Sequence, residues 1–415
     1  MTRSESLRAD ASAMQDELVE LRHTLHRRPE VGLQLPRTQE TVLQALDGLG
    51  LEVSTGSELS SVTAVLRGGR PGPAVLLRGD MDALPVQEET GLDFSSEVDG
   101  AMHACGHDLH TSMLVGAARL LCRHRDQLAG DVVFMFQPGE EGWNGAGVMI
   151  EEGVLEAAGR RVDAAYGMHV FSALEPHGRF ATRPGAMLSA SDELHVTVHG
   201  EGGHGASPQL AKDPVPAVAE MVTGLQTMVT RQFDMFDPVL VTVGLLRAGT
   251  KANVIPGTAT LQATVRTYSP QSRERMVEAA PRLLRGIAAA HGLEATVDYV
   301  EQYPVTVNDV AETEFAARVI TELLGEDRHA RMPHPWGGSE DFSRVLDRVP
   351  GSFIALGAVP VGLDPARAAF NHSPYAQYDD DVLPDGAAIY AELAIRRLER
   401  LAGTASTAAT GSAAP

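Results

Sequence analysis

Residues 132–141 of this 415-residue chain read VVFMFQPGEE, five apolar residues followed by a turn and two adjacent carboxylates. An apolar run followed by a polar cluster recurs in AVLLRGDMD at residues 74–82 and in AAYGMH at residues 164–169. Short apolar runs that end in turn residues are typical of strands buried on both faces of a sheet. Residues 111–123 place their apolar side chains on one helical face. This alternation predicts an α/β domain with an open, mostly parallel sheet and helices on both faces.

The pattern changes near Leu188, where a second kind of domain begins. Strands and helices follow one another there in the order βαββαβ. The predicted strands are residues 193–199, 239–246, 258–267 and 293–300, and the predicted helices are residues 215–230 and 272–291. This order is that of a ferredoxin-like α+β unit, whose neighbouring termini allow it to be inserted into another domain.

The sequence therefore predicts a discontinuous first domain, residues 1–186 and 303–402, interrupted by an inserted domain, residues 187–302. Residues 403–415 consist almost entirely of Ala, Thr, Ser and Gly. Such a segment buries too little apolar surface to offset its chain entropy, so we expect a disordered tail.

Composition and charge exclude several classes of partner. The chain has 34 Lys and Arg against 55 Asp and Glu, a formal net charge of −21 that repels phosphate backbones and anionic lipids. Its apolar runs fall far short of the ~20 residues that span a bilayer, and its start shows no signal-peptide pattern. Cys105 and Cys122 are too few for a disulfide framework. We expect a cytoplasmic protein with neither nucleic-acid nor membrane partners.

The densest chemical signal is MHACGHDLH at residues 102–110, which combines a thiol, three imidazoles and a carboxylate. Cys105 and His107 can point the same way only from an extended or turn segment, and Gly106 permits a tight turn between them. These residue types favour a metal site. The alternative is that Asp108 caps a helix beside a buried cysteine.

Further candidate ligands follow two of the predicted strands. Glu140 and Glu141 come directly after a turn, and adjacent carboxylates on a turn diverge, so that one can bind a metal while the other faces a water molecule. A pair of this kind is otherwise a solvated surface. His169 follows a strand and His372 lies in FNHSPY, and either alone is more often structural. Together they favour a metallohydrolase.

With these motifs in view, the sequence resembles the di-metal aminoacylase and carboxypeptidase-G-like metallopeptidases. It is similar to their amidohydrolase branch, which contains hippurate hydrolases, N-acyl-amino-acid amidohydrolases and auxin-conjugate hydrolases. The resemblance covers roughly residues 16–400. Its motifs are LHRRPE (25–30), RGDMDALP (78–85), CGHDLH (105–110), QPGEE (137–141), GMH (167–169), GGHGASP (202–208), NVIP (253–256), GSEDF (338–342) and HSP (372–374).

The resemblance implies a zinc-peptidase-like fold that holds two divalent metal ions per subunit. Glu140 would be the general base, and Asp82 would orient a ligand. Asp80 stands where sister branches carry a metal-binding histidine. The implied metal ligands are Cys105, His107, Glu141, His169 and His372. Ligands of mixed N, O and S type suit Zn²⁺, Mn²⁺, Ni²⁺ or Co²⁺ and disfavour Mg²⁺ and Ca²⁺.

The inserted domain is implied to serve as a lid and as the dimerisation domain of a homodimer. His204 would reach the substrate of the other subunit, while Asn253 and Arg266 would hold the substrate's carboxylate. Two positions depart from the family's pattern: Gln209 replaces a common histidine, and residues 33–37 lack an acidic residue often found before Thr38.

The implied reaction is hydrolysis of N-acyl amino acids, such as N-acetyl or N-benzoyl compounds, to a carboxylic acid and a free amino acid. A metal-activated water would attack the amide while Glu140 moves the proton. One alternative is a dipeptidase or a carbamoyl or ureido hydrolase of the same fold. Another is a non-catalytic metal-binding dimer.

Overall fold

The computed structural model describes residues 2–411, which fall into two compact units. The first unit comprises Met1–Gly185, Val307–His334 and Arg344–Pro415, and the second comprises Ala186–Thr306 and Pro335–Ser343. The segment Pro335–Ser343 lies outside the range that the sequence predicts for the inserted domain. It belongs to the second unit because the backbone N–H of Ser189 donates hydrogen bonds to the carbonyls of Trp336 (3.2 Å) and Gly338 (2.9 Å).

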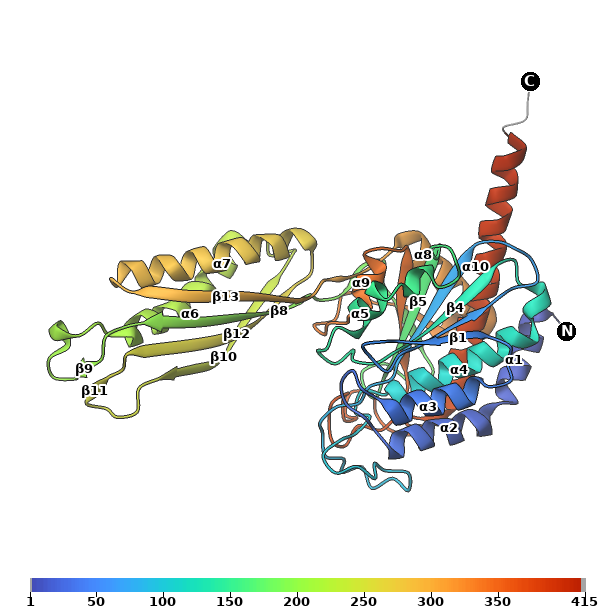
Figure 1. The fold of residues 1–415 in the computed structure, drawn as a ribbon, viewed down its shortest axis with the longest axis horizontal. Helices are drawn as coiled ribbons and strands as arrows, with labels where there is room; N and C mark the ends of the chain where they lie inside the picture. The colour runs from blue at the N-terminus through green and yellow to red at the C-terminus, as the bar shows by residue number, and fades with distance from the viewer. Residues whose placement is uncertain (1, 412–415) are drawn as a thin grey trace. The chain divides into compact units, whose positions relative to one another are not determined.

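Within residues 2–411, the first unit is built on an eight-stranded sheet of order β1-β2-β4-β3-β5-β16-β6-β15 (Figure 1). Its strands are β1 (Glu52–Thr55), β2 (Val62–Leu66), β3 (Ala74–Asp80), β4 (Asp131–Gln137), β5 (Ala164–Phe171), β6 (Phe180–Thr182), β15 (His329–Arg331) and β16 (Gly351–Gly357). The central strands β4, β3, β5 and β16 pair in parallel. The mostly parallel sheet predicted from the apolar runs is confirmed.

Helices and short turns surround this sheet. The helices of the first unit are α1 (Arg3–Ser12), α2 (Gln15–Arg27), α3 (Pro36–Leu46), α4 (His107–Arg123), α5 (Gly145–Glu151), α8 (Val310–Leu324), α9 (Ser343–Leu346) and α10 (Leu383–Gly411). Turns of 3₁₀ helix occupy Arg125–Gln127, Val154–Glu156, Glu326–Arg328 and Asp380–Val382. Strands β7 (Gly185–Leu188) and β14 (Thr306–Asn308) lie where the chain passes from one unit to the other.

The core of the first unit explains why its strands are continuous apolar runs. Leu77, Phe134 and Tyr166 point from β3, β4 and β5 into a cluster shared with α4 and α10. The alternate residues Leu76 and Val133, on the opposite face of the sheet, are equally buried. Because both faces are covered, most residues on both faces of these strands are apolar, and buried polar residues such as Arg78 and Gln137 come toward the carboxyl ends.

Within the described residues, the second unit is an antiparallel four-stranded sheet of order β10-β12-β8-β13 covered by two helices. Its elements are β8 (Ser191–His199), β9 (Gly203–His204), a 3₁₀ turn (Pro208–Leu210), α6 (Pro214–Gln232), β10 (Val239–Ala248), β11 (Val254–Ile255), β12 (Thr258–Thr267), α7 (Pro270–Ala290) and β13 (Glu294–Tyr303). On β8, Leu194 and Val196 pack against the helices while His195 faces the other way. The predicted ferredoxin-like βαββαβ order is confirmed.

Helix α10 extends further than the sequence predicts, through Gly411. Residues 403–411 are therefore helical rather than part of a disordered tail. Alanine has the highest helix propensity, and an existing helix is extended without a new nucleation step. The rest of the predicted tail, residues 412–415, lies outside the described residues. None of the helices within residues 2–411 is long and apolar enough to cross a membrane.

Candidate metal centre

The candidate ligands converge where the parallel strands of the first unit end. Strands β3, β4 and β5 run side by side; the carboxyl ends of β3 and β4 lead into Asp82 and Glu140, and His169 lies within β5 near its carboxyl end, not after the strand as the sequence predicted. Crevices beyond the carboxyl ends of such strands are the usual ligand sites of open α/β sheets. Helix α4 begins at His107 at the same edge and adds the thiol of Cys105 from the turn before it.

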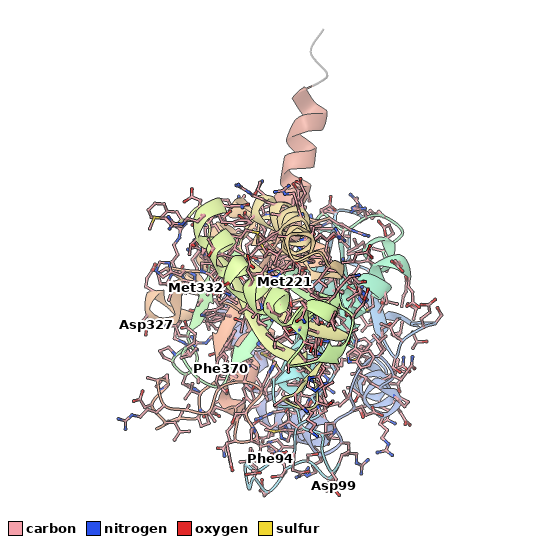
Figure 2. The ribbon with its side chains drawn as sticks, turned by 90° about the vertical axis from the view of Figure 1, so that its left-hand side faces the viewer. Phe94, Asp99, Met221, Asp327, Met332 and Phe370 are labelled. Carbon is pink, nitrogen blue, oxygen red and sulfur yellow. The ribbon has the colours of Figure 1, made fainter. Side chains whose placement is uncertain are left out.

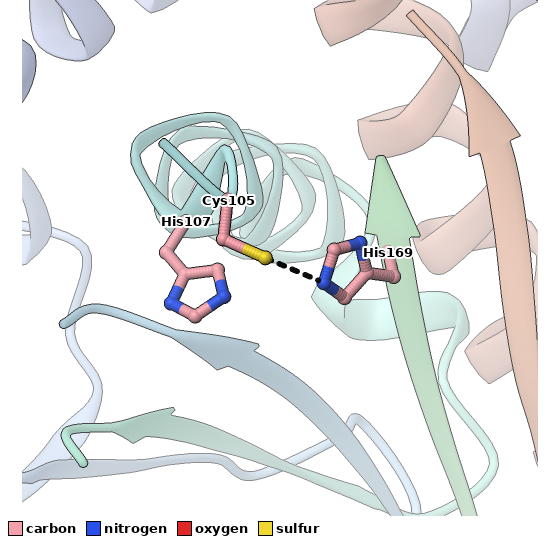
Figure 3. A group of neighbouring side chains, drawn as sticks. All are labelled: Cys105, His107 and His169. Atoms are coloured by element: carbon pink, nitrogen blue, oxygen red, sulfur yellow. Dashed lines mark hydrogen bonds between the residues drawn. The ribbon is translucent and has the colours of Figure 1, made fainter. Parts of the chain in front are cut away.

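Gly106 makes this turn possible. Its φ is +84°, in the left-handed region that favours glycine, and a Cβ added there would lie 2.4 Å from Cγ2 of Val170. A side chain at this position would therefore push the ligand turn away from strand β5. The tight approach leaves Sγ of Cys105 3.4 Å from Nε2 of His169, with His107 beside them (Figure 3).

The hydrogen bonds of His169 fix which of its nitrogens faces the centre. Nδ1 lies 2.8 Å from the backbone carbonyl of Val170, so it must carry the proton and donate it. Nε2 is then an unprotonated lone pair directed at Cys105. Burial lowers the pKa of His169 well below its usual range, which keeps the ring neutral. A neutral imidazole oriented through its other nitrogen is the usual form of a metal-binding histidine.

The carboxylate of Glu141 and the imidazole of His372 complete the same cluster. Nε2 of His372 lies 3.3 Å from Sγ of Cys105 and 3.2 Å from Oε1 of Glu141. Hydrogen bonds to these two acidic groups raise the pKa of His372 to about 10. The donor atoms of Cys105, Glu141 and His372 all lie within 4.8 Å of one another, as do those of Cys105, His107 and His169.

The bonding of His107 is the observation that tests whether these residues fit a metal. His107 is completely buried, yet neither ring nitrogen has a hydrogen-bond partner among the described residues. Nε2 lies 3.5 Å from Oδ2 of Asp80 and Nδ1 lies 3.5 Å from Oδ1 of Asp82, too long for good hydrogen bonds. Burial lowers the pKa of His107, but the charge of Asp80 together with the interactions with Asp82 and Cys105 outweighs this effect and raises the pKa well above its usual range. The pocket attracts positive charge, and its donor set fits dications.

Asp82 shapes the turn that carries the two glutamates. Its Oδ1 accepts a hydrogen bond from the backbone N–H of Glu140, and its Oδ2 accepts one from that of Glu141, both at 3.0 Å. One side chain from just after β3 thus holds the backbone of both glutamates, whose carboxylate oxygens lie within 4.8 Å of each other and not on diverging sides of the turn. Carboxylate oxygens of Glu140 and Glu141 lie within 4.8 Å of a His107 nitrogen.

Asp80 stands at the position where sister branches carry a metal-binding histidine, and here it contacts side chains that surround the centre. Its Oδ2 lies 2.6 Å from Nη1 of Arg78, and its Oδ1 accepts a 2.5 Å hydrogen bond from Nδ1 of His110. Nε2 of His110 in turn accepts the backbone N–H of Val170 at 2.8 Å, next to His169. This chain of contacts links the end of β3 to α4 and to the strand that carries His169.

The second unit holds the remaining predicted site residues, and it brings only two of them together. His204 on β9 pairs with Val254 on β11, and the N–H of Gly205 donates to the carbonyl of Asn253 (2.9 Å). Nδ1 of His204 accepts the backbone N–H of Ala206, which leaves the proton on Nε2 free to be donated.

Arg266 lies elsewhere in that unit, eight residues along β12 from Thr258. At ~3.3 Å per strand residue, this separation is about 26 Å. Its Nη1 is buried without a hydrogen-bond partner in the described part of the chain. Burial also lowers the pKa of Arg266. A buried guanidinium with a free N–H group can receive an anionic substrate group.

Two further groups lie near the centre. His103 is buried with neither ring nitrogen hydrogen-bonded among the described residues, burial lowers its pKa to about 3, and it belongs to none of the candidate metal-binding groups among those residues. Asn371, next to His372, hydrogen-bonds to Cys105 and Val170. Its place beside a candidate ligand in FNHSPY was the only signal that could have indicated it.

Comparison with known proteins adds to this geometry. The model of peptidase family M20/M25/M40 matches residues 76–396. The chain is 35% identical over 398 residues to thermostable carboxypeptidase 1 of Saccharolobus solfataricus, covering 94% of this chain and 98% of that protein. It is 34% identical over 390 residues to the N-acetylcysteine deacetylase of Bacillus subtilis, covering 94% and 99%. The crystal structure of the Bacillus subtilis protein YXEP, a dinuclear metal-binding M20 peptidase, aligns with a TM-score of 0.80 and 32% identity over 94% of this chain and 99% of that one.

Proposed function

The chain belongs to peptidase family M20/M25/M40 and is a metal-dependent amidohydrolase, and from this premise we propose that it cleaves the amide bond of N-acyl amino acids. The products are a carboxylic acid and a free amino acid. One observation carries the proposal: a buried, electron-rich cluster of N, O and S donors lies directly beside the carboxylate of Glu140. A protein that only stored metal would have no need of that adjacent base.

The side chains divide the work of this reaction. Cys105, His107, Glu141, His169 and His372 would hold two divalent ions, which when bound polarise the amide carbonyl and acidify a water molecule. Zn²⁺, Mn²⁺, Ni²⁺ and Co²⁺ match these donors. Glu140 takes the proton from the attacking water and then delivers it to the leaving nitrogen. Asp82 holds the backbone of Glu140 and Glu141 through two hydrogen bonds.

The substrate's polar ends are assigned to the second unit. Nε2–H of His204 is free to donate to the oxygen on which negative charge develops. Arg266 and Asn253 supply N–H groups for the substrate's carboxylate. His204 lies on the separate two-stranded β9–β11 sheet, whereas Arg266 lies near the far end of β12, so we assign the two residues to the sites of different subunits in a homodimer. Strand β10 lies at an edge of the four-stranded sheet, and the backbone groups on its outer side offer a surface for a two-fold partner.

The test of the activity is a matrix of metals and substrates. The protein is treated with a chelator, shown by elemental analysis to be metal-free, and reloaded separately with Zn²⁺, Mn²⁺, Co²⁺ and Ni²⁺. N-acetyl and N-benzoyl amino acids are assayed beside dipeptides and carbamoyl amino acids, since one relative is a carboxypeptidase. We expect N-acyl amino acids to give the highest kcat/KM and the metal-free protein to be inactive. Full activity of the metal-free protein contradicts the proposal.

The homodimer is tested by subunit mixing. Glu140→Gln and His204→Ala proteins, each inactive, are exchanged under conditions in which mass spectrometry verifies mixed dimers. If His204 acts on the partner's substrate, each mixed dimer contains one complete site and activity returns. Verified mixed dimers without activity place His204 within its own chain's site or outside catalysis.

A further inference from the structure

The side-chain amide of Asn371 lies among three chain segments that each carry a candidate ligand. Its Oδ1 accepts a hydrogen bond from the backbone N–H of Ser172 (3.0 Å) and lies 3.1 Å from the hydroxyl of the same residue, whose single hydrogen it shares with the carbonyl of Ala369. Its Nδ2 donates to the carbonyls of Val170 (3.1 Å) and Cys105 (3.3 Å). The amide thus connects the turn of Cys105, the strand after His169 and the loop of His372. Both its donor and acceptor groups are used.

The partners leave one possible orientation for this amide. The backbone N–H of Ser172 requires an acceptor, whereas the carbonyls of Cys105 and Val170 require donors. Nδ2 must therefore face Cys105, whose Sγ lies 3.8 Å away. The same carbonyl of Val170 also receives the Nδ1–H of His169. Asn371 consequently contacts the sulfur of one ligand and the backbone group that orients a second.

The third ligand depends on Asn371 through the backbone. His372 has a φ of +72°, a left-handed conformation that is rare for a residue with a Cβ and persists only where the surroundings impose it. The backbone N–H of His372 donates to the carbonyl of Ala104 at 2.8 Å, and the hydroxyl of Ser172 donates to the carbonyl of Ala369 at 2.8 Å. These bonds and the Asn371 amide hold the backbone of His372 and the residues that precede it. Figure 2 labels Phe370, which marks this loop.

We propose that Asn371 is a positioning residue of the metal centre, whose amide holds Cys105, His169 and His372 in register and directs an N–H group at the Cys105 sulfur. The proposal rests on the metal-dependent function proposed above. Asn371 binds no metal itself. An N–H group facing a thiolate withdraws charge from the sulfur, and groups that hold metal ligands in place change metal affinity by roughly 10- to 100-fold when altered.

The experiment compares two isosteric changes in the cobalt-loaded protein. Asn371→Asp keeps the shape and the acceptor to Ser172 but places an oxygen against two carbonyls and the sulfur. Asn308→Asp is the matched control, because Asn308 donates to the carbonyls of Arg183 and Phe353 (both 3.0 Å) and accepts the N–H of Phe353 (2.7 Å) in the same unit. The readouts are the Co²⁺ dissociation constant, the thiolate-to-cobalt charge-transfer band and the Tm of the metal-free protein.

The expected results separate positioning from general stability. Asn371→Asp should weaken Co²⁺ binding by roughly 10- to 100-fold and shift the charge-transfer band. Asn308→Asp should lower Tm while leaving the affinity and the band unchanged. Should Asn371→Asp fail to fold, Ser172→Ala decides, because it removes only the hydroxyl that holds the amide and predicts a smaller shift in the same direction.

Two negative outcomes differ in meaning. If the wild-type protein binds no Co²⁺, the metal-dependent function itself fails. If the wild type binds Co²⁺ and the Asn371→Asp protein, or Ser172→Ala in its place, matches it in affinity and spectrum, the positioning role alone is overturned. An equal loss of Co²⁺ affinity in the Asn308→Asp control also overturns the positioning role.

Discussion

His107 and Asp108 are neighbours in the first turn of α4, and they belong to two buried polar clusters of opposite character. Oδ2 of Asp108 accepts hydrogen bonds from Nε of Arg22 (3.1 Å) and Nδ1 of His26 (2.8 Å). Neither ring nitrogen of His107 has a hydrogen-bond partner among the described residues. Asp108 pairs with basic side chains of the chain itself, whereas the carboxylates and the thiol around His107 outnumber the basic side chains, Arg78 and His372, that pair with them.

This difference separates a structural network from a functional one. Burying a charge costs free energy unless it is paired, so a chain selected only for stability would pair both clusters. The Arg22–Asp108–His26 cluster follows that rule: the Arg22 and His26 charges lower the pKa of Asp108 far below its usual value against the effect of burial. The centre around His107 departs from it, as expected where an exogenous dication supplies the missing charge.

The largest expected effect is on kcat, from a change at the metal centre around His107. Glu140→Gln should keep its metal but lower kcat by about 10²–10⁴-fold or more, because the proton acceptor is gone. Glu141→Gln should lose metal as well as activity, since a donor is removed. Metal analysis and single-turnover kinetics on both proteins measure this. Identical behaviour of the two variants would show that the division between base and ligand is wrong.

A change in the Arg22–Asp108–His26 cluster should affect stability instead of kcat. Arg22→Met leaves Asp108 buried with half of its partners, and breaking a buried ion pair in this way costs about 3–5 kcal/mol of unfolding free energy. Denaturant unfolding of the metal-free protein measures the loss. The kcat per folded, metal-loaded molecule should stay within twofold of the wild type. A large fall in kcat without loss of stability would erase the contrast between the clusters.

The smallest expected effect is on the pH dependence of stability, which the Arg22–Asp108–His26 cluster should influence through His26. Burial lowers the pKa of His26, but the charge and hydrogen bond of Asp108 outweigh it and raise this pKa to about 9. Because the folded pKa exceeds the unfolded value of about 6.5, the stabilisation is complete below pH ~6.5 and lost as pH rises through ~9, on the order of 3 kcal/mol. Urea unfolding between pH 6 and 10 measures this. The unfolding free energy of the His26→Gln protein should not show this loss. If the variant loses stability with pH as steeply as the wild type, His26 is not the group responsible.

Local patterns predicted the fold well where packing is also local. The apolar runs of β3, β4 and β5 are buried on both faces, so their sequence is compatible only with buried strands. The alternation of apolar and polar residues in β8 follows from its single covered face. Helix α1 was missed because its sequence, RSESLRADAS, carries almost no apolar stripe, and its start depends on a capping box between Thr2 and Glu5.

The candidate site was predictable to the extent that its candidate ligands share short motifs. Cys105 and His107 stand two residues apart, and Glu140 and Glu141 follow a strand end, so chemistry and position pointed to them together. The bonds of Arg22 to Asp108 and of Asn371 to Cys105 join residues 86 and 266 positions apart. No local pattern encodes such pairs, because they depend on how the sheet and its helices pack.

The order of the candidate ligands along the chain has a consequence for biosynthesis. Cys105, His107, Glu141 and His169 are all synthesised before the second unit, whereas His372 follows only after that unit and strand β16. Domains fold as units during synthesis, beginning at the N-terminus. A nascent chain that ends before His372 therefore contains an incomplete centre, and the cell can complete that centre around metal only after the second unit and β16 have been made.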